Sequence, residues 1–132
     1  GESAPPVLTG CLRNARAVAT AARALGTTFT VCPAGERWSD GSLRFAVEDW
    51  LGAGAILRHL SGTRSVEAEA AVAAFERSEG AMRAALMASA SGRELIELGY
   101  SIDVECAAQA DSSERVPRLV GNAFVDISGE TT

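Results

Sequence analysis

The chain has 132 residues, of which 47% are hydrophobic and 22% charged, and it carries a net charge of −5. This size and composition predict one soluble globular domain with a single core. The charges are spread along the chain without blocks, which disfavours nucleic acid and membrane surfaces as partners because both bind through clustered cations. No apolar run is long enough to span a bilayer and the first residues lack the pattern of a signal peptide, so we expect a cytoplasmic protein.

The reactive side chains exclude several catalytic classes. All 12 cationic residues are arginine, which excludes a P-loop lysine or Schiff-base chemistry within these residues and favours forked contacts to phosphate, sulfonate or carboxylate. Codon bias alone also explains this composition. His59 is the single histidine and the three cysteines are widely spaced, so a zinc site is disfavoured and the thiols are expected in the core. Any metal is expected to be a hard cation held by carboxylates.

The first third of the chain predicts a β-α-β unit. Residues 6–12 and 27–32 are apolar runs typical of strands, and residues 13–25 between them have a helical pattern that Gly26 closes. Strands joined in this way are parallel, with a right-handed crossover. Ligand sites lie beyond the carboxyl ends of such strands, so we expect the loops around Arg13 and Glu36 to open on one edge.

The remainder of the chain predicts mainly helices. After a polar turn, Ser42 is expected to begin a helix over residues 43–60. The later predictions are helical residues 65–90 with a break at Gly80, a capping box at 91–94, a helix stop at Gly99, a short helix over 103–110, a strand over 123–127 and a frayed tail over 128–132. Expected packing positions in the long helical stretch are Val66, Val72, Phe75, Met82, Leu86 and Met87. Two strands are too few for a covered parallel sheet. Either the pattern conceals further strands or residues outside this chain complete the sheet, and we favour the second explanation.

Asp49 is the carboxylate that the pattern singles out. A helical wheel over residues 43–60 places it beside the apolar face, where an unpaired charge is costly. Helical side chains lean toward the helix N-terminus, so Asp49 should reach back to the turn that contains Glu36. A metal or substrate contact and an ion pair with Arg13 or Arg37 both explain such a residue.

Other candidate ligand groups can also be explained by structural roles. Glu48 lies on the polar arc of the wheel, four residues after Arg44, as in a surface ion pair. Asn14 lies at a helix start on the inward side, where it caps the helix or contacts a ligand. Gly35 and Gly41 flank a polar loop whose backbone can approach an anion closely.

Taken together, several segments of the chain resemble the 2-phosphosulfolactate phosphatase family. The resemblance rests on LRNARAVA (12–19), PAGERW (33–38), GSLR (41–44), Glu48-Asp49, GAGAI (52–56) and SGREL (91–95), continued by Asp103-Val104 and Val116-Pro117. The family's chains are nearly twice as long, and their N-terminal half, with its Asp-Val-Leu-Arg and Thr-Asn-Gly-Thr segments, is absent. Residues 1–132 therefore resemble a single domain that forms the C-terminal half of such a protein.

The resemblance implies a three-layer α/β/α sandwich with a mainly parallel sheet, of which this chain supplies part. It also implies Mg²⁺-dependent hydrolysis of a phosphate monoester of a small anionic acid, giving 3-sulfolactate and phosphate in the best-known members. We expect Glu36 and Asp49 to be catalytic and to bind Mg²⁺ together with Glu48. Substrate contacts are expected from Arg13, Asn14, Arg37, Ser42 and Arg44.

The expected partners are a small phosphorylated acid, a second copy in a homodimer, and the missing N-terminal half. Two other functions also fit the sequence: a module that binds a phosphorylated or sulfonated metabolite without turnover, and an inactive structural fragment.

Overall fold

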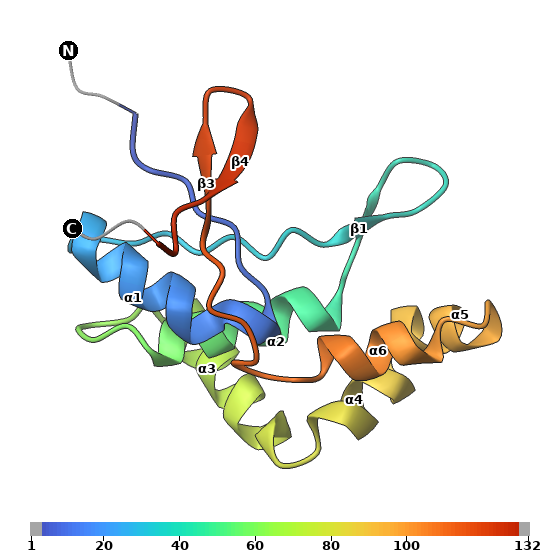
Figure 1. The fold of residues 1–132 in the computed structure, drawn as a ribbon. Helices are drawn as coiled ribbons and strands as arrows, with labels where there is room; N and C mark the ends of the chain where they lie inside the picture. Colours follow the sequence, from blue (N-terminus) through green and yellow to red (C-terminus); the bar gives the residue numbers. More distant parts are fainter. Residues whose placement is uncertain (1–3, 130–132) are drawn as a thin grey trace.

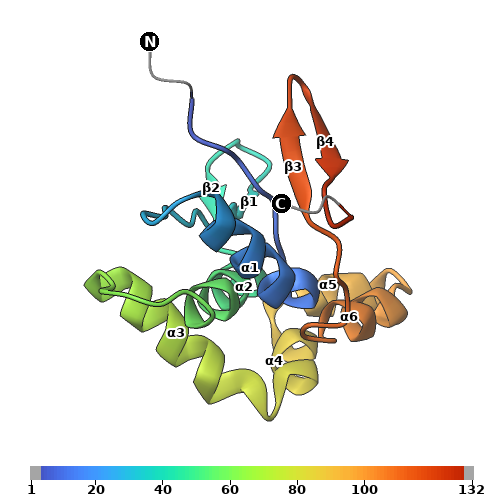
Figure 2. The same ribbon diagram turned by 60° about the vertical axis from the view of Figure 1, so that its left-hand side comes forward.

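Helices form the body of the protein in the computed structural model, which describes residues 4–129 (Figure 1). A 3-10 turn over Leu12–Asn14 leads into α1 (Ala15–Leu25), followed by α2 (Val47–Arg58), α3 (Val66–Glu79), α4 (Met82–Ala88), α5 (Ala90–Glu97) and α6 (Ser101–Ala107). Two antiparallel hairpins, β1 (Glu36–Arg37) with β2 (Leu43–Arg44) and β3 (Pro117–Val120) with β4 (Ala123–Asp126), project from this body (Figure 2). The fold is therefore a mixture of helices and small sheets.

Helix α2 lies at the centre of the core and contacts α1, the 3-10 turn and α3. Its middle, from Leu51 to Ala55, is buried on all sides, so the two-sided wheel drawn from the sequence is wrong for this helix. Gly54 lets α3 cross closely, because a Cβ there would lie 2.1 Å from the carbonyl oxygen of Ala71. The residues at the centre of the core are Leu12, Ala15, Leu51, Ala55, Phe75, Met82, Leu86 and Val104.

The helix breaks predicted after residue 65 are confirmed. Gly80 is the C-cap of α3, and Gly99 follows α5 with a positive φ of 88°. The N–H groups of Gly99 and Tyr100 donate to carbonyls in the last turn of α5, which is the hydrogen-bond pattern of a Schellman motif. Of the expected packing positions, Val66 is wrong because it is 84% exposed.

The cap of α5 lies two residues earlier than the predicted capping box. Ser89 is the N-cap, and its hydroxyl accepts a hydrogen bond from the N–H of Gly92 at 3.0 Å. Ser91 instead lies inside the helix and is free to bond elsewhere.

The two strands of the predicted β-α-β unit do not form. Near residue 8 the N-terminal segment makes a single antiparallel bridge to Arg118 of β3. Residues 27–34 are extended, and no hydrogen bond joins their backbone to any other described residue. Because a strand is defined by its neighbours, an apolar run without a partner stays an irregular extended segment. All strand pairs within residues 4–129 are antiparallel.

The helix predicted over residues 43–60 begins only at Val47. Ser42 does not cap it, because its N–H and hydroxyl both donate to the carboxylate of Asp40 at 2.9 and 2.6 Å. This Asx turn, with Gly41 at a φ of 86°, folds the chain into a hairpin in which Arg37 pairs with Leu43. Residues 43–46 therefore lie outside the helix, so the wheel is wrong for these positions, and Leu43 is 73% exposed.

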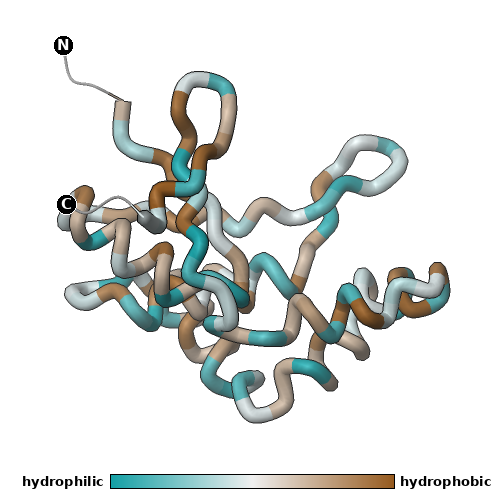
Figure 3. The backbone as a smooth tube through the Cα atoms, viewed as in Figure 1, coloured by the Kyte–Doolittle hydropathy of each residue, from teal (hydrophilic) through white to brown (hydrophobic). Residues whose placement is uncertain are grey.

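The strand predicted over residues 123–127 exists as β4 (Ala123–Asp126), and it pairs with β3, for which no strand was predicted. Apolar residues lie on both arms of this hairpin and remain exposed (Figure 3). The Asp126 carboxylate accepts hydrogen bonds from the N–H of Val116 and from Arg115, which hold its pKa far below the usual range. Of the predicted tail, residues 130–132 lie outside the described residues.

Two further expectations concern the cysteines and membrane-spanning segments. Cys11 and Cys32 are exposed rather than packed in the core. Within residues 4–129, no helix has the length and apolar character needed to cross a membrane.

Candidate functional site

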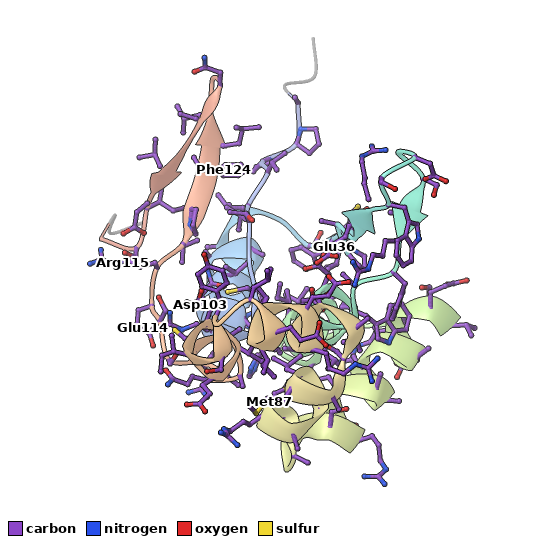
Figure 4. The ribbon with its side chains drawn as sticks, turned by 90° about the vertical axis from the view of Figure 1, so that its right-hand side faces the viewer. Glu36, Met87, Asp103, Glu114, Arg115 and Phe124 are labelled. Atoms are coloured by element: carbon purple, nitrogen blue, oxygen red, sulfur yellow. The ribbon has the colours of Figure 1, made fainter. Side chains whose placement is uncertain are left out.

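Glu36 lies where the β1–β2 hairpin meets the helices, and two neighbours fix its carboxylate (Figure 4). Ser91 of α5 donates its hydroxyl to Oε1 at 3.1 Å, and Arg44 of β2 places Nη1 3.5 Å from Oε2. Arg44 also bonds to Glu94 of α5 at 3.0 Å, and its guanidinium lies 4.8 Å from the centre of the Trp38 ring. These contacts fasten the hairpin to α5.

Arg44 is the electrostatic centre of this cluster. Its side chain is 11% exposed and lies within 4 Å of two carboxylates. The hydrogen bond to Glu94 raises the pKa of Arg44 above its usual value, and the charges of Glu36 and Glu48 act in the same direction. The guanidinium is therefore occupied in holding acidic side chains, and its contribution to a ligand site is to position Glu36.

Asp49 reaches back from the first turn of α2 to the preceding loop, in the direction that its helical tilt predicts. Its Oδ2 accepts a hydrogen bond from the N–H of Gly35 at 2.7 Å. Gly35 has a φ of 70°, and a Cβ there would lie 3.1 Å from the carbonyl oxygen of Arg44, so this close approach requires glycine. The backbone, rather than Arg13 or Arg37, is thus the partner of Asp49.

The prediction that Glu48 forms a surface ion pair with Arg44 is wrong. The residue is half-buried, and its Oε2 is buried with no hydrogen-bond partner in the described part of the chain. Arg44 belongs to a strand rather than to the helix, so the expected spacing of one helical turn does not exist. A buried carboxylate oxygen without a donor costs about 1–3 kcal/mol, which makes it a candidate for an external ligand.

Two predicted ligand residues lie at the exposed end of the hairpin. Arg37 donates to the carbonyl of Gly41 at 2.8 Å, and Ser42 bonds to Asp40. Both side chains are accessible, on the same hairpin as Glu36.

Arg13 and Asn14 belong to a different part of the molecule. Asn14 is buried, accepts the N–H of Cys11 at 2.8 Å and donates to the carbonyl of Arg115 at 2.9 Å. Arg13 donates from Nε to the hydroxyl of Ser112 at 3.0 Å. These bonds tie the start of α1 to residues 112–115, and none of them reaches the hairpin cluster.

Asp111 lies in a turn after α6 and contacts two charged or polar partners from other elements. Its Oδ1 accepts the backbone N–H of Arg16 at 2.8 Å, while Oδ2 lies 3.2 Å from the Arg16 guanidinium and 3.3 Å from Nε2 of His59. Burial acts to raise the pKa of Asp111, but the hydrogen bonds and positive charges of Arg16 and His59 outweigh it and lower that pKa. The partners are 95 and 52 residues away in sequence, so no local pattern indicates the contact.

Comparison with known proteins places the chain in a family. A family model described as 2-phosphosulpholactate phosphatase matches residues 1–122. The chain belongs to this family. The matched residues include the hairpin, the start of α2 and α5, which together form the cluster around Glu36.

Curated members of the 2-phosphosulfolactate phosphatase family show the same relationship. The chain is 35% identical over 115 residues to a probable 2-phosphosulfolactate phosphatase of Gloeobacter violaceus, a match that covers 87% of the chain and 47% of that relative. It is 37% identical over 110 residues to the 2-phosphosulfolactate phosphatase of Methanothermobacter thermautotrophicus, covering 83% of the chain and 46% of the relative. A probable 2-phosphosulfolactate phosphatase of Thermotoga maritima is 35% identical over 83 residues, covering 62% and 37%. The chain thus spans about half the length of the curated relatives it matches.

The carboxylates around the start of α2 are the kind of ligand that a hard cation prefers, but they do not form a complete set of metal ligands. The carboxylates of Glu48, Asp49 and Glu36 are oxygen donors, and the buried Oε2 of Glu48 has no other partner among the described residues. Within residues 4–129, however, no group of three His, Cys, Asp or Glu side chains lies close enough together to hold a metal ion. Mg²⁺ commonly takes only one or two protein carboxylates and completes its shell with water and substrate phosphate, so such a set fits it.

Proposed function

We propose that this chain forms one wall of the active site of a Mg²⁺-dependent phosphatase. The substrate is a phosphate monoester of a small anionic acid, namely 2-phosphosulfolactate or a related compound. The observation that carries the proposal is the buried Oε2 of Glu48, which lacks a partner in the described chain and stands next to Asp49 at the start of α2. Membership of the 2-phosphosulfolactate phosphatase family supports the reaction class.

In this proposal Glu48 and Asp49 bind Mg²⁺, and Glu36 reaches the ion through water, because the three carboxylates do not lie close enough together to ligate one ion directly. The cation supplies charge neutralisation at the phosphate, which phosphoryl transfer needs more than covalent assistance. The N–H of Gly35 holds Asp49 in one orientation, and Ser91 and Arg44 do the same for Glu36. Preorganised carboxylates avoid reorganisation when the substrate binds.

The hairpin residues contact the acid groups of the substrate. Arg37 and Ser42 are exposed on this hairpin, where a forked guanidinium and a hydroxyl suit sulfonate or carboxylate oxygens. Arg44 acts through Glu36 rather than directly. Arg13 and Asn14 would contact the substrate only if the fold of the complete protein brings the start of α1 next to the hairpin. In hydrolysis, the water oxygen forms a new bond to phosphorus as the bond between phosphorus and the ester oxygen breaks, and the hydroxy acid leaves with a proton from the water.

We further propose that the complete protein is a cytoplasmic homodimer with a three-layer α/β/α fold and a mainly parallel sheet. The free thiols of Cys11, Cys32 and Cys106 support a reducing compartment. The sheet depends on segments that have no strand partners within the described residues.

The test is phosphate release from 2-phosphosulfolactate by the full-length protein, measured with and without Mg²⁺. We expect Mg²⁺-dependent release by the wild type, and a loss of at least about 100-fold for Glu48→Gln and Asp49→Asn, comparable to the loss of other electrostatic groups in active sites. Glu76→Gln, an exposed carboxylate on α3, is the matched control and should keep full activity.

Retention of Mg²⁺-dependent release by Asp49→Asn would overturn the central assignment. Binding of the phosphorylated acid without phosphate release would favour a non-catalytic binding module. If the protein neither binds the phosphorylated acid nor releases phosphate, a purely structural role is favoured.

A further inference from the structure

Residues 27–34 have the features of a strand without a sheet. Figure 1 shows them as an extended trace that runs from the end of α1 to β1. Their exposure alternates, since Phe29 and Val31 are half-buried whereas Thr28, Thr30 and Cys32 are exposed. This period of two is the signature of a strand that covers a core with one face.

The backbone of this segment has its hydrogen-bonding capacity unused. Among the described residues, no N–H or C=O of residues 27–34 has a hydrogen-bond partner. By contrast, the N-terminal segment bonds to β3, with the N–H of Thr9 3.0 Å from the carbonyl of Pro117. A row of unpaired backbone groups in an extended segment rich in β-branched and aromatic residues is a template for strand addition.

The segment also stands away from the helices behind it. A cavity of about 560 Å³ lies between it and the helical body, with Phe29 and Val31 on one side and Trp50 and Leu57 of α2 among the residues on the other. Phe29 and Val31 therefore line this space without filling it. Pairing with a further strand would fix the segment and seat its two apolar side chains.

We propose that residues 27–33 are the docking edge for a β-strand of the part of the family fold that lies outside this chain. The occupant is inferred from chain length, because matches that cover 87% and 83% of this chain cover only 47% and 46% of the two relatives. The remaining length of these relatives is about as long as the part that matches this chain, which is enough for further strands. The inference rests on the proposed partial sheet and names the surface through which it is completed.

This edge leads directly into the candidate site. Two residues after position 33 comes Gly35, whose N–H holds Asp49, and Glu36 follows it. A strand paired to residues 27–33 would therefore end beside these carboxylates, where a parallel sheet places its ligand site. Docking would both complete the sheet and supply the second wall of the site.

The test uses the part of the Gloeobacter violaceus relative outside its 115 matched residues, co-expressed as a tagged polypeptide with this chain. We expect the two to co-purify in a 1:1 complex, measured by light scattering after size exclusion. Hydrogen exchange should show amides in residues 28–32 slowed by about 100-fold or more in the complex relative to the chain alone, as for other strands paired in a sheet.

Variants at Thr30 separate strand pairing from other contacts. Thr30→Pro removes an N–H from an exposed position and should abolish co-purification, whereas Thr30→Val keeps the N–H and should retain it. Circular dichroism checks that both variants keep the helices, and the exchange measurement on the wild type requires no variant.

Three outcomes would overturn the proposal: no complex, a complex in which amides 28–32 exchange as fast as in the free chain, or protection of these amides in a homodimer of the chain alone. The result is independent of the phosphatase assignment. A protected complex that releases no phosphate would sustain the docking edge while removing the proposed reaction.

Discussion

Replacing Asp111 by alanine should destabilise the fold more than its position in an exposed turn suggests. The carboxylate caps α1 from a distance, because its Oδ1 accepts the N–H of Arg16 in the first turn of that helix. It also faces the Arg16 guanidinium and His59, with 14% of the Asp111 side chain exposed. One residue thereby joins α1, the end of α2 and the segment after α6.

The size of the effect follows from these contacts. A lost helix cap costs about 1 kcal/mol, and the interaction of a carboxylate with the helix N-terminus contributes about 0.5 kcal/mol. The Arg16 side chain is 66% exposed, so its ion pair adds at most about 0.5 kcal/mol. Asp111 also has a φ of 50°, a conformation that aspartate tolerates better than alanine. We therefore expect Asp111→Ala to lower the free energy of unfolding by about 2–3 kcal/mol.

Urea unfolding at neutral pH measures this value. Asp111→Asn keeps an acceptor and tolerates the positive φ, so it should lose only about 1 kcal/mol, and Asp111→Gly should lie between the two because glycine relieves the backbone strain. Asp103→Ala, an exposed carboxylate in the first turn of α6, should change the free energy by less than about 0.5 kcal/mol. Equal losses for the alanine, asparagine and glycine variants at position 111 would refute the reasoning.

The contacts of Asp111 also predict how the free energy of unfolding changes with pH. The folded pKa of Asp111 is lowered below its ordinary value of 3.8, so its charge stabilises the fold above that value. This contribution is lost as the pH falls through the folded pKa. The difference in free energy of unfolding between wild type and Asp111→Asn should therefore shrink when the pH is taken below about 4. A difference that stays constant between neutral pH and pH 3 would contradict the lowered pKa.

Three further predictions concern packing, capping and the metal. Gly54→Ala should cost about 3 kcal/mol or prevent folding, because the new Cβ would lie 2.1 Å from the carbonyl oxygen of Ala71, whereas Gly80→Ala, which meets nothing within 4 Å, should leave the thermal midpoint nearly unchanged. Ser89→Ala removes the side-chain cap of α5 and should lower the free energy of unfolding in urea by about 1 kcal/mol. Glu48→Gln should raise the thermal midpoint without Mg²⁺, since it removes a buried charge whose Oε2 has no partner among the described residues. The same variant should abolish any stabilisation by added Mg²⁺. Unchanged stabilisation by Mg²⁺ would contradict the role of Glu48 in metal binding.

The sequence by itself determined the helices and several of their ends. Gly80 and Gly99 interrupt helical patterns, and their effect depends on backbone geometry within a few residues. The tilt of Asp49 toward the preceding turn also follows from local helix geometry, and the structure places its oxygen on the N–H of Gly35. The family could likewise be identified from short segments in their order along the chain.

Tertiary structure decided the features that depend on partners distant in sequence. The apolar residues 27–32 have a strand pattern, but a strand requires a neighbouring backbone, and the described chain provides none. Glu36 is held by Ser91, 55 residues away, and Asp111 by Arg16, 95 residues away. Local patterns report the conformation of a segment and which face is apolar, whereas the position of a carboxylate within a site depends on the packing of separate elements. For the same reason, the burial of Glu48 appeared only when α2 was packed against its neighbours.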